Sequence, residues 1–252
     1  MNNSDEKYFF ARLSDMVSRC ERNDICVFSD FLDERQSVQA DEWCRRNAGG
    51  LSYKLWGGYD GAGRKMLAVY PDFYEDYIIE DFPFRCITFT YRKEDKLTHR
   101  DFLGTFMGMN FRRDIIGDIV VGEGMTQAFV MNFAGKLISA TVSKIGKTGV
   151  KCSDGKPFEM EVRQEFRTVS GTVASLRIDS IVSLATGLSR EKSAVMIRSE
   201  RVEINHIITE TVSAEVKTGD IISVRGHGKY ILSEVGGNTR KNRIHIIIKK
   251  FV

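Results

Sequence analysis

Four basic side chains lie close together in the sequence between residues 190 and 201. Two of them, Arg190 and Arg198, are eight residues apart, which places them roughly 80° apart around a helix of 3.6 residues per turn. Lys192 lies on the same predicted helix, and Arg201 follows at the mouth of a strand. A compact group of cations can match the phosphate spacing of folded RNA without entering its deep groove. Taken alone, however, the same group is typical of an ordinary solvated helix face.

The surrounding sequence predicts two short helices followed by a strand. Residues 175–185 repeat apolar side chains at i, i+3, i+4 and i+7, and Gly187 follows where a left-handed cap is needed. Ser189 is a suitable N-cap for the second helix. Residues 201–205 alternate as a strand, and a turn at 217–220 leads into another strand at 221–224.

This order of elements resembles an S4-type RNA-binding domain. The matching segments are Arg177-Ile178-Asp179, Ser189-Arg190, Arg201-Val202-Glu203-Ile204-Asn205 and Gly219-Asp220-Ile221-Ile222. The resemblance implies that basic residues of the second helix and the strand mouth bind folded RNA, typically ribosomal RNA. The expected RNA contacts are Arg177, Arg190, Lys192, Arg198 and Arg201, with Ser189 and Asn205 shaping the surface. Arg177 could instead form a structural ion pair with Asp179.

The remaining C-terminal sequence adds more cations beside this motif. Residues 229–234 and 243–251 alternate as two strands, joined by a glycine-containing turn. We include in the expected RNA-binding set Arg225, Lys229, Arg240, Lys241 and Arg243. Such a turn could reach a phosphate, or it could merely keep the hairpin soluble.

Charge is distributed unevenly along the 252 residues. Residues 170–252 hold thirteen Lys and Arg against eight Asp and Glu, a balance of +5. Because the whole chain carries +3, residues 1–169 carry −2. The basic excess therefore coincides with the S4-like motif, as expected for a nucleic-acid-binding region.

Cysteine usage and hydropathy favour a soluble protein of the cytoplasm. The five cysteines are odd in number and scattered, without a C-x-x-C pair or histidines at metal-ligand spacing. We therefore expect no metal and no cofactor. The first ten residues lack a signal-peptide pattern, and no apolar run approaches membrane-spanning length.

The organisation expected before the motif is a small helical region and a mixed domain. Helices are predicted within residues 6–47, where Asp33 could cap the second helix. Strands at 52–55, 65–69, 86–91, 118–121, 127–130 and 149–152 alternate with helices at 100–109 and 133–145. We therefore predict an α+β chain with a helical region (1–48), a ferredoxin/RRM-like sandwich (49–165) and an S4-type domain with added β-strands (172–252). Residues 153–174 are expected to be a strand followed by a linker.

Several local features of the mixed domain favour structural roles. Gly122-Glu123-Gly124 is typical of a hairpin turn, and the glycine-rich stretch 57–63 lacks the ending of a phosphate-binding loop. His99 opens a helix without a histidine or cysteine partner, so a capping or surface role is expected. Phe89 and Tyr91 could form an RNA-stacking pair, but core and edge packing is the more frequent use of such a pair.

The similarity extends over almost all of residues 25–252, which resemble the bacterial YlmH family. It rests on the segments Leu32-Asp33-x-Arg35, Gly57-Gly58-Tyr59 with Arg64, Pro71-Asp72, His99-Arg100-Asp101-Phe102-Leu103-Gly104, Ile116-Gly117-Asp118-Ile119, Ser175 to Asp179 and Ser223-Val224-Arg225-Gly226-x-Gly228. The family, also called RqcP, has relatives known in photosynthetic organisms as photosystem II S4-domain proteins. Glu34, Gln36 and His206 depart from its usual residues.

This resemblance implies a non-enzymatic RNA-binding factor of the large ribosomal subunit. The S4 domain would bind large-subunit rRNA, while the N-terminal parts approach a P-site tRNA that carries a stalled chain. In ribosome-associated quality control it would steady this peptidyl-tRNA while the partner RqcH adds alanine. The residues expected to face the tRNA are Asp33, Arg35 and Arg64.

Two other classes of function use the same kind of RNA-binding motif. An S4-guided enzyme, such as a pseudouridine synthase, an rRNA methyltransferase or a tyrosyl-tRNA synthetase, needs a catalytic core. The sequence shows no G-R-L-D segment outside the motif, no H-I-G-H and no K-M-S-K-S. No catalytic residue is therefore expected. A regulator that binds structured mRNA or a small RNA would use the same surface.

Overall fold

The computed structural model of the chain describes residues 3–75, 77–155, 166–239 and 243–251. It divides into two compact units, Met1–Val162 and Arg163–Val252. The architecture is α+β, as predicted, with several antiparallel sheets. Within the described residues, no helix is long and apolar enough to cross a membrane.

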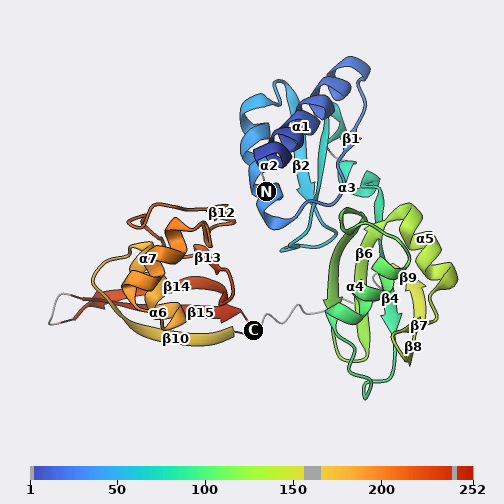
Figure 1. Ribbon diagram of the computed structural model, residues 1–252. Coiled ribbons are helices and arrows are strands. Elements are labelled where there is room, and N and C mark those ends of the chain that lie inside the picture. Colours follow the sequence, from blue (N-terminus) through green and yellow to red (C-terminus); the bar gives the residue numbers. More distant parts are fainter. Residues whose placement is uncertain (1–2, 76, 156–165, 240–242, 252) are drawn as a thin grey trace. The chain divides into compact units, whose positions relative to one another are not determined.

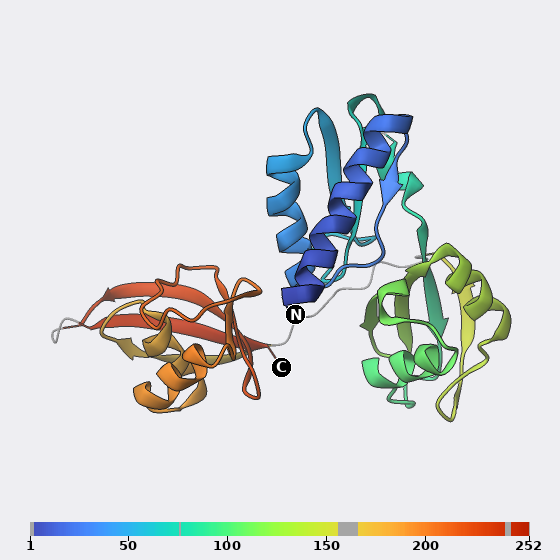
Figure 2. The ribbon, with the colours of Figure 1, turned by 45° about the horizontal axis from the view of Figure 1, so that its top comes forward.

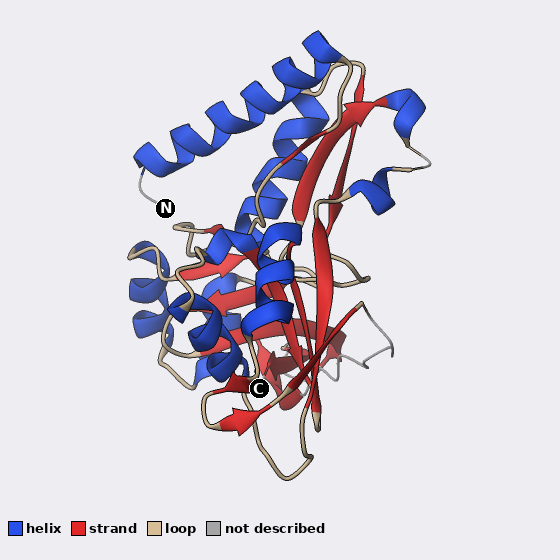
Figure 3. Ribbon diagram, turned by 90° about the vertical axis from the view of Figure 1, so that its right-hand side faces the viewer, coloured by secondary structure: helices blue, strands red, loops and turns tan. Residues whose placement is uncertain are grey.

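The first part of unit 1 packs two helices against a three-stranded sheet. Helices α1 (Asn3–Asn23) and α2 (Glu34–Asn47) lie beside β1 (Val27–Phe28), β2 (Leu51–Trp56) and β3 (Met66–Pro71), in the sheet order β1-β3-β2 (Figure 1). The long helix α1 is seen in side view in Figure 3. Its buried side chains recur at helical spacing and form one core with the sheet: Phe9, Leu13, Met16, Val17 and Cys20.

The grouping of the β2–β3 hairpin corrects the sequence-based division at residue 48. We expected this hairpin to belong to the mixed domain, but it pairs only with β1 among the described strands. The reason lies in β3, which is buried along its whole length. Leu67 and Val69 join the core under the helices, while Met66, Ala68 and Tyr70 join an aromatic cluster on the opposite face.

The second part of unit 1 begins with the 3₁₀ helix η1 (Asp72–Tyr74) and α3 (Ile78–Asp81). Its sheet contains β4 (Phe84–Thr90), β5 (Ile116–Val121), β6 (Met125–Met131) and β9 (Lys151–Asp154), in the antiparallel order β5-β6-β4-β9. Helix α4 (His99–Gly108) and the 3₁₀ helix η2 (Arg113–Ile115) precede β5, and α5 (Asn132–Thr141) follows β6. This β-α-β-β-α-β arrangement is ferredoxin-like, as predicted.

The predicted helix 133–145 ends earlier than expected. Helix α5 stops at Thr141, and a short hairpin follows with β7 (Lys144–Ile145) and β8 (Thr148–Gly149). Gly146, at the turn, has a positive φ of 57°. The hairpin forms because Ile145 and Val150 enter the core beneath α4 and α5 from an extended segment. The predicted loop at 57–63 does connect β2 with β3, and Gly122 begins the turn between β5 and β6.

Unit 2 is a six-stranded antiparallel sheet covered by α6 (Ile178–Thr186) and α7 (Arg190–Arg198), as Figure 2 shows. The sheet order is β10-β15-β14-β13-β11-β12. The strands are β10 (Phe166–Val173), β11 (Val202–Ile204), β12 (Ile207–Ile208), β13 (Ile221–Val224), β14 (Gly228–Asn238) and β15 (Ile244–Phe251). Its core includes Ile178, Ile181 and Val182 from α6.

The predicted linker before unit 2 is partly a strand. Residues 166–173 form β10 and pair with β15 from Phe166↔Phe251 to Val173↔Ile244, whereas residues 156–165 lie outside the described part. Gly171 lies within β10, where it allows close packing against α6. A Cβ at this position would lie 2.5 Å from a methyl carbon of Leu184 on α6, so any larger residue would require the Leu184 side chain to move.

Candidate nucleic-acid interface

A buried carboxylate holds two arginines at the start of α6. Asp179 accepts hydrogen bonds from Nε of Arg177 at 3.2 Å and from Nη2 of Arg190 at 2.6 Å. The Asp179 side chain is 7% exposed, whereas those of Arg177 and Arg190 are 44% and 54% exposed. The carboxylate therefore fixes two guanidinium groups at the surface while leaving much of each accessible.

The same contacts decide the ionisation of Asp179. Burial alone would raise the pKa of this carboxyl, but the hydrogen bond and charge of Arg190, together with Arg177, outweigh burial and lower the pKa. Asp179 therefore stays ionised at neutral pH. Arg177 thus forms the ion pair that the sequence left open, and it remains part of the exposed cationic surface.

Helix α7 presents the other predicted cations. Ser189 caps it, as predicted, by accepting a hydrogen bond from the backbone N–H of Lys192, and Gly187 ends α6 with φ of 76°. Lys192, Arg198 and Arg201 are exposed. None of these three forms an ion pair with another described residue, so their charges are available to an anionic partner.

Asn205 holds the turn that follows β11. Its side-chain oxygen accepts a hydrogen bond from the Ile221 N–H at 2.9 Å, and its amide donates to Asp220 at 2.8 Å. Asn205 and His206 both have positive φ and form the two-residue turn between β11 and β12. This turn fixes β11 against β13, and the Arg225 N–H bonds to the Arg201 carbonyl at 2.9 Å.

The remaining predicted cations of unit 2 occupy other positions. Arg243 donates to the Thr172 carbonyl at 2.7 Å and lines a hollow of about 440 Å³ together with Arg190. The ammonium of Lys229 lies 5.4 Å from the centre of the Phe251 ring. Arg225 is exposed. Arg240 and Lys241 lie outside the described residues.

In unit 1, the three residues expected to face tRNA have local partners. Asp33 caps α2 by accepting the Gln36 N–H at 2.7 Å, and Gln36 returns a capping-box contact. Arg35 lies 3.8 Å from Glu6. The Arg64 guanidinium donates to the carbonyls of Phe31, Arg113 and Ile116. The described contacts therefore give each of them a structural role.

Arg64 belongs to a partly buried network that sequence reasoning missed. Its backbone N–H donates to Asp118 at 3.0 Å, and the same carboxylate accepts the Gly63 N–H and the Tyr59 hydroxyl, both at 2.7 Å. Arg113 donates to the carbonyls of Ile116 and Gly117. The available signal was an aspartate, Asp118, within the otherwise apolar strand β5.

Burial shifts the pKa values of this network. It lowers the pKa of Arg64, and burial with the nearby Arg64 charge lowers that of Arg113 to about 10. Burial and the bond to Asp118 raise the pKa of Tyr59. Burial and Arg113 also lower the pKa of His99. The network joins the two sheets of unit 1, and its guanidinium groups donate to backbone carbonyls.

The aromatic pair considered for base stacking is part of the core. Phe89 is fully buried and lies 5.3 Å, centre to centre, from Phe102 of α4. The Tyr91 hydroxyl bonds to the Gly122 carbonyl at 3.0 Å. Phe89 is therefore closed to a base, and the partly buried Tyr91, just after the strand, packs against Phe102 of α4.

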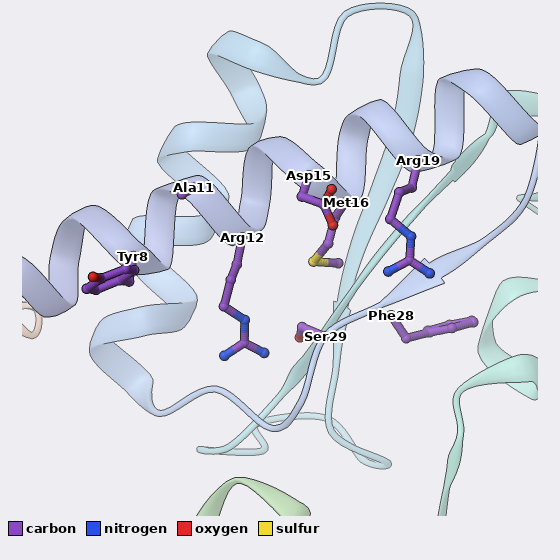
Figure 4. A pocket seen from close by; sticks show the side chains of 8 residues that line it. All are labelled: Tyr8, Ala11, Arg12, Asp15, Met16, Arg19, Phe28 and Ser29. Carbon is purple, nitrogen blue, oxygen red and sulfur yellow. The ribbon is translucent and has the colours of Figure 1, made fainter.

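Another hollow, of about 430 Å³, runs along α1 beside β1. Figure 4 shows Arg12 and Arg19 extending from the same side of α1 toward the segment that carries Phe28 and Ser29. Arg12 is neutralised by Asp30 at 3.0 Å. Positive and negative groups are therefore mixed here, in contrast to the exposed cations of unit 2.

Exposed cations held on a two-helix surface are a feature of many proteins of the RNA-binding class. Residues 78–159 match the family model described as "Putative RNA-binding domain in YlmH". Over 232 residues the chain is 29% identical to "Ribosome-associated protein quality control protein P2" of Bacillus subtilis, covering 88% of this chain and 86% of that protein. These matches bear out the resemblance to the YlmH family that the sequence motifs predicted.

A solved structure supports the fold. "Cell division protein ylmH" from Streptococcus pneumoniae is similar with a TM-score of 0.51 at 20% sequence identity. The match covers 61% of this chain and 93% of that one. At this level of identity the similarity concerns the fold alone.

Proposed function

We propose that the chain is a non-enzymatic factor of ribosome-associated quality control in the cytoplasm. It binds large-subunit rRNA through unit 2 and steadies P-site peptidyl-tRNA while an RqcH-type partner extends the stalled chain with alanine. The name of the Bacillus subtilis relative supports the process, and the match over residues 78–159 supports RNA as the ligand.

The observation that carries this proposal is the pair of arginines fixed by Asp179. Holding Arg177 and Arg190 in place before binding reduces the side-chain entropy that RNA binding would otherwise cost. The cations of α7 and the β11 mouth that form no ion pair with a described residue extend the surface. We assign to it Arg177, Arg190, Lys192, Arg198 and Arg201, flanked by Arg225, Lys229 and Arg243. We do not assign Asp33, Arg35 and Arg64 to this RNA-binding surface, because each of them contacts other residues of unit 1.

The test is sedimentation of cell extract on a sucrose gradient, with the protein followed by immunoblot. The wild type should comigrate with large subunits, and the Arg190→Ala/Arg201→Ala variant should stay at the top. The matched control is Arg167→Ala/Lys249→Ala, which removes the same charge from the β10–β15 pair. Equal comigration of all three proteins would contradict the assignment of the surface.

A second measurement separates this function from that of an RNA-modifying enzyme. Deletion of the gene should leave the modifications of large-subunit rRNA unchanged while reducing alanine tailing of stalled chains. A missing methyl group or pseudouridine in the deletion strain would favour the S4-guided enzyme. Selective crosslinking to one mRNA, without ribosome binding, would favour a regulator.

A further inference from the structure

A long stretch of the ferredoxin-like domain carries only positive charge. Residues 125–153 contain four lysines and no aspartate, glutamate or arginine, although the whole chain has 34 acidic residues among 252. The lysines are Lys136, Lys144, Lys147 and Lys151. All four are exposed. None of them forms an ion pair with another residue that the structure describes.

The strand register places two of these lysines on one side of a ribbon. Lys144 pairs with Gly149 and Ile145 with Thr148, and the Val150 N–H bonds to the Ser143 carbonyl at 3.0 Å. Continuing this register puts Lys151 opposite residue 142, diagonal to Lys144 and on the same side. Ile145 and Val150 occupy the other side and enter the core. Lys147 lies in the turn at the tip of the hairpin.

Helix α5 adds an aromatic ring and a fourth cation. Ala134 and Ile138 are buried on one face of α5, while Phe133, Lys136 and Leu137 are exposed at spacings i, i+3 and i+4. Phe133 is 57% exposed. Its ring is held edge to face by the buried Phe111, at 6.4 Å between centres. An exposed ring in a fixed orientation beside a cation is suited to base stacking.

The opposite face of the sheet is not free for this role. In RRM domains, bases stack on aromatic side chains of the open sheet face. Here Cys86 and Phe129 of that face are buried in one cluster with Phe31, Met66 and Tyr70 from the first part of unit 1. The part of this face around Cys86 and Phe129 is therefore closed to RNA, whereas Lys151, which pairs with Thr90, lies toward the other end of β4.

We propose that Lys136, Lys144, Lys147, Lys151 and Phe133 form a second RNA-binding surface, the lysine surface, which takes unpaired nucleotides. The lysines contact successive phosphates, and Phe133 stacks on one base. The proposal rests on the RNA-binding function inferred above and assigns residues to the domain at 78–159. It requires no contact with unit 2.

The test uses the full chain and a fluorescein-labelled single-stranded oligouridine of about 12 nucleotides, a length within the site sizes of single-strand binders. Anisotropy is measured over a salt series, in the Arg190→Ala/Arg201→Ala background so that unit 2 contributes little. Replacing the four lysines by alanine should weaken binding at least tenfold and make the salt slope shallower by up to about 3, at about 0.7 per lost contact.

Phe133 supplies a separate signature. Phe133→Ala should weaken binding about tenfold with an unchanged salt slope, because stacking releases no counterions. The matched control is Lys93→Ala/Lys96→Ala, in the exposed loop before α4, where Glu94 and Asp95 lie between the two lysines. This control should bind as its parent does. Tryptophan fluorescence verifies folding, because both tryptophans, Trp43 and Trp56, lie in unit 1.

The outcomes separate the two proposals. If the four-lysine variant keeps its oligouridine affinity and salt slope, the lysine surface is refuted, whatever the sucrose gradient shows for unit 2. Equal losses in the four-lysine variant and the Lys93/Lys96 control would also refute it, because the effect would then be one of net charge. Loss of large-subunit comigration in Arg190→Ala/Arg201→Ala bears only on the function proposed for unit 2.

Discussion

Two aspartates organise arginine-containing sites in the two units, with opposite consequences. In unit 1, Asp118 accepts hydrogen bonds from the Tyr59 hydroxyl and from the backbone N–H groups of Gly63 and Arg64. The Arg64 guanidinium donates instead to backbone carbonyl groups. In unit 2, Asp179 accepts bonds from two guanidinium groups that remain about half exposed.

The difference shows that an Arg–Asp motif does not by itself define a binding site. Where the guanidinium is partly buried and donates to backbone carbonyls, as at Arg64, the arginine has a structural role. Where the aspartate is buried and the arginines are exposed, as at Asp179, the carboxylate positions charge for a partner. Whether the arginine or the aspartate is the buried member therefore decides whether the pair has a structural or a binding role.

The largest effect is expected for Asp118→Ala. Three donors would lose their acceptor within the protein, at about 1 kcal/mol or more each, so unit 1 should be destabilised by about 3 kcal/mol. Urea unfolding followed by tryptophan fluorescence measures this, because both tryptophans belong to unit 1. Asp60→Ala, in the same loop as Gly63 and exposed, is the control. Equal midpoints for the two variants would contradict the role of Asp118.

The next largest effect is expected when one arginine of each unit is replaced and both stability and ribosome binding are measured for each variant. Arg64→Ala should destabilise unit 1 by about 2 kcal/mol, since a cation that bonds to buried carbonyls is lost, and should leave the salt slope of ribosome binding unchanged. Arg177→Ala should leave the tryptophan transition unchanged and make the slope shallower by about 1. If Arg64→Ala makes the salt slope of ribosome binding as shallow as Arg177→Ala does, the proposed difference between the two arginines is wrong.

Asp179→Ala should have a smaller effect on stability, about 1 kcal/mol in unit 2, because the freed arginines are already partly hydrated. It should nevertheless weaken binding to the large subunit about fivefold, since Arg177 and Arg190 lose their fixed positions. If only net charge mattered, Asp179→Ala would bind the large subunit more tightly, because a negative charge is removed. Stability is measured from the amide NMR signals of unit 2, and affinity by sedimentation; tighter binding would favour charge counting.

The smallest effects are expected from pH, in separate windows for the two units. Because the pKa of folded His99 lies below 6.5, the unfolded state binds more protons, so unit 1 should lose stability as pH falls through 6.5. The lowered pKa of Asp179 stabilises unit 2 above the unfolded value of 3.8, and this contribution should be lost as pH falls below it. His99→Gln and Asp179→Asn should each flatten one window. A single shared window, detected by tryptophan fluorescence and NMR, would contradict this separation.

The sequence predicted elements with strong local signals. The spacing of Ile178, Ile181 and Val182, the Gly187 cap and the Ser189 cap together defined α6 and α7, and the structure confirms them. The ferredoxin-like order was also predictable, because its strands and helices alternate along the chain. These features depend on residues within one or two turns of each other.

Features that depend on distant residues were missed. Asp118 meets Tyr59 and Gly63 only after two sheets have packed, so its place in an apolar strand marks it as unusual but does not show which residues it contacts. The β2–β3 hairpin was assigned to the wrong neighbours, because apolar residues on both faces of β3 do not show which layer covers each face. The assignment of RNA-binding residues remains a prediction for the variants to test.

The pairing of β10 with β15 bears on how unit 2 could be reused. Phe166 and Phe251 lie opposite each other, with ring centres 5.0 Å apart, so the chain enters and leaves the sheet at adjacent points. Such a unit can be grafted into a surface loop of another protein through two neighbouring junctions, without stretching either sheet. It can also be circularly permuted by joining these points and opening a loop elsewhere. Both junctions of unit 2 therefore lie at the same end of its sheet.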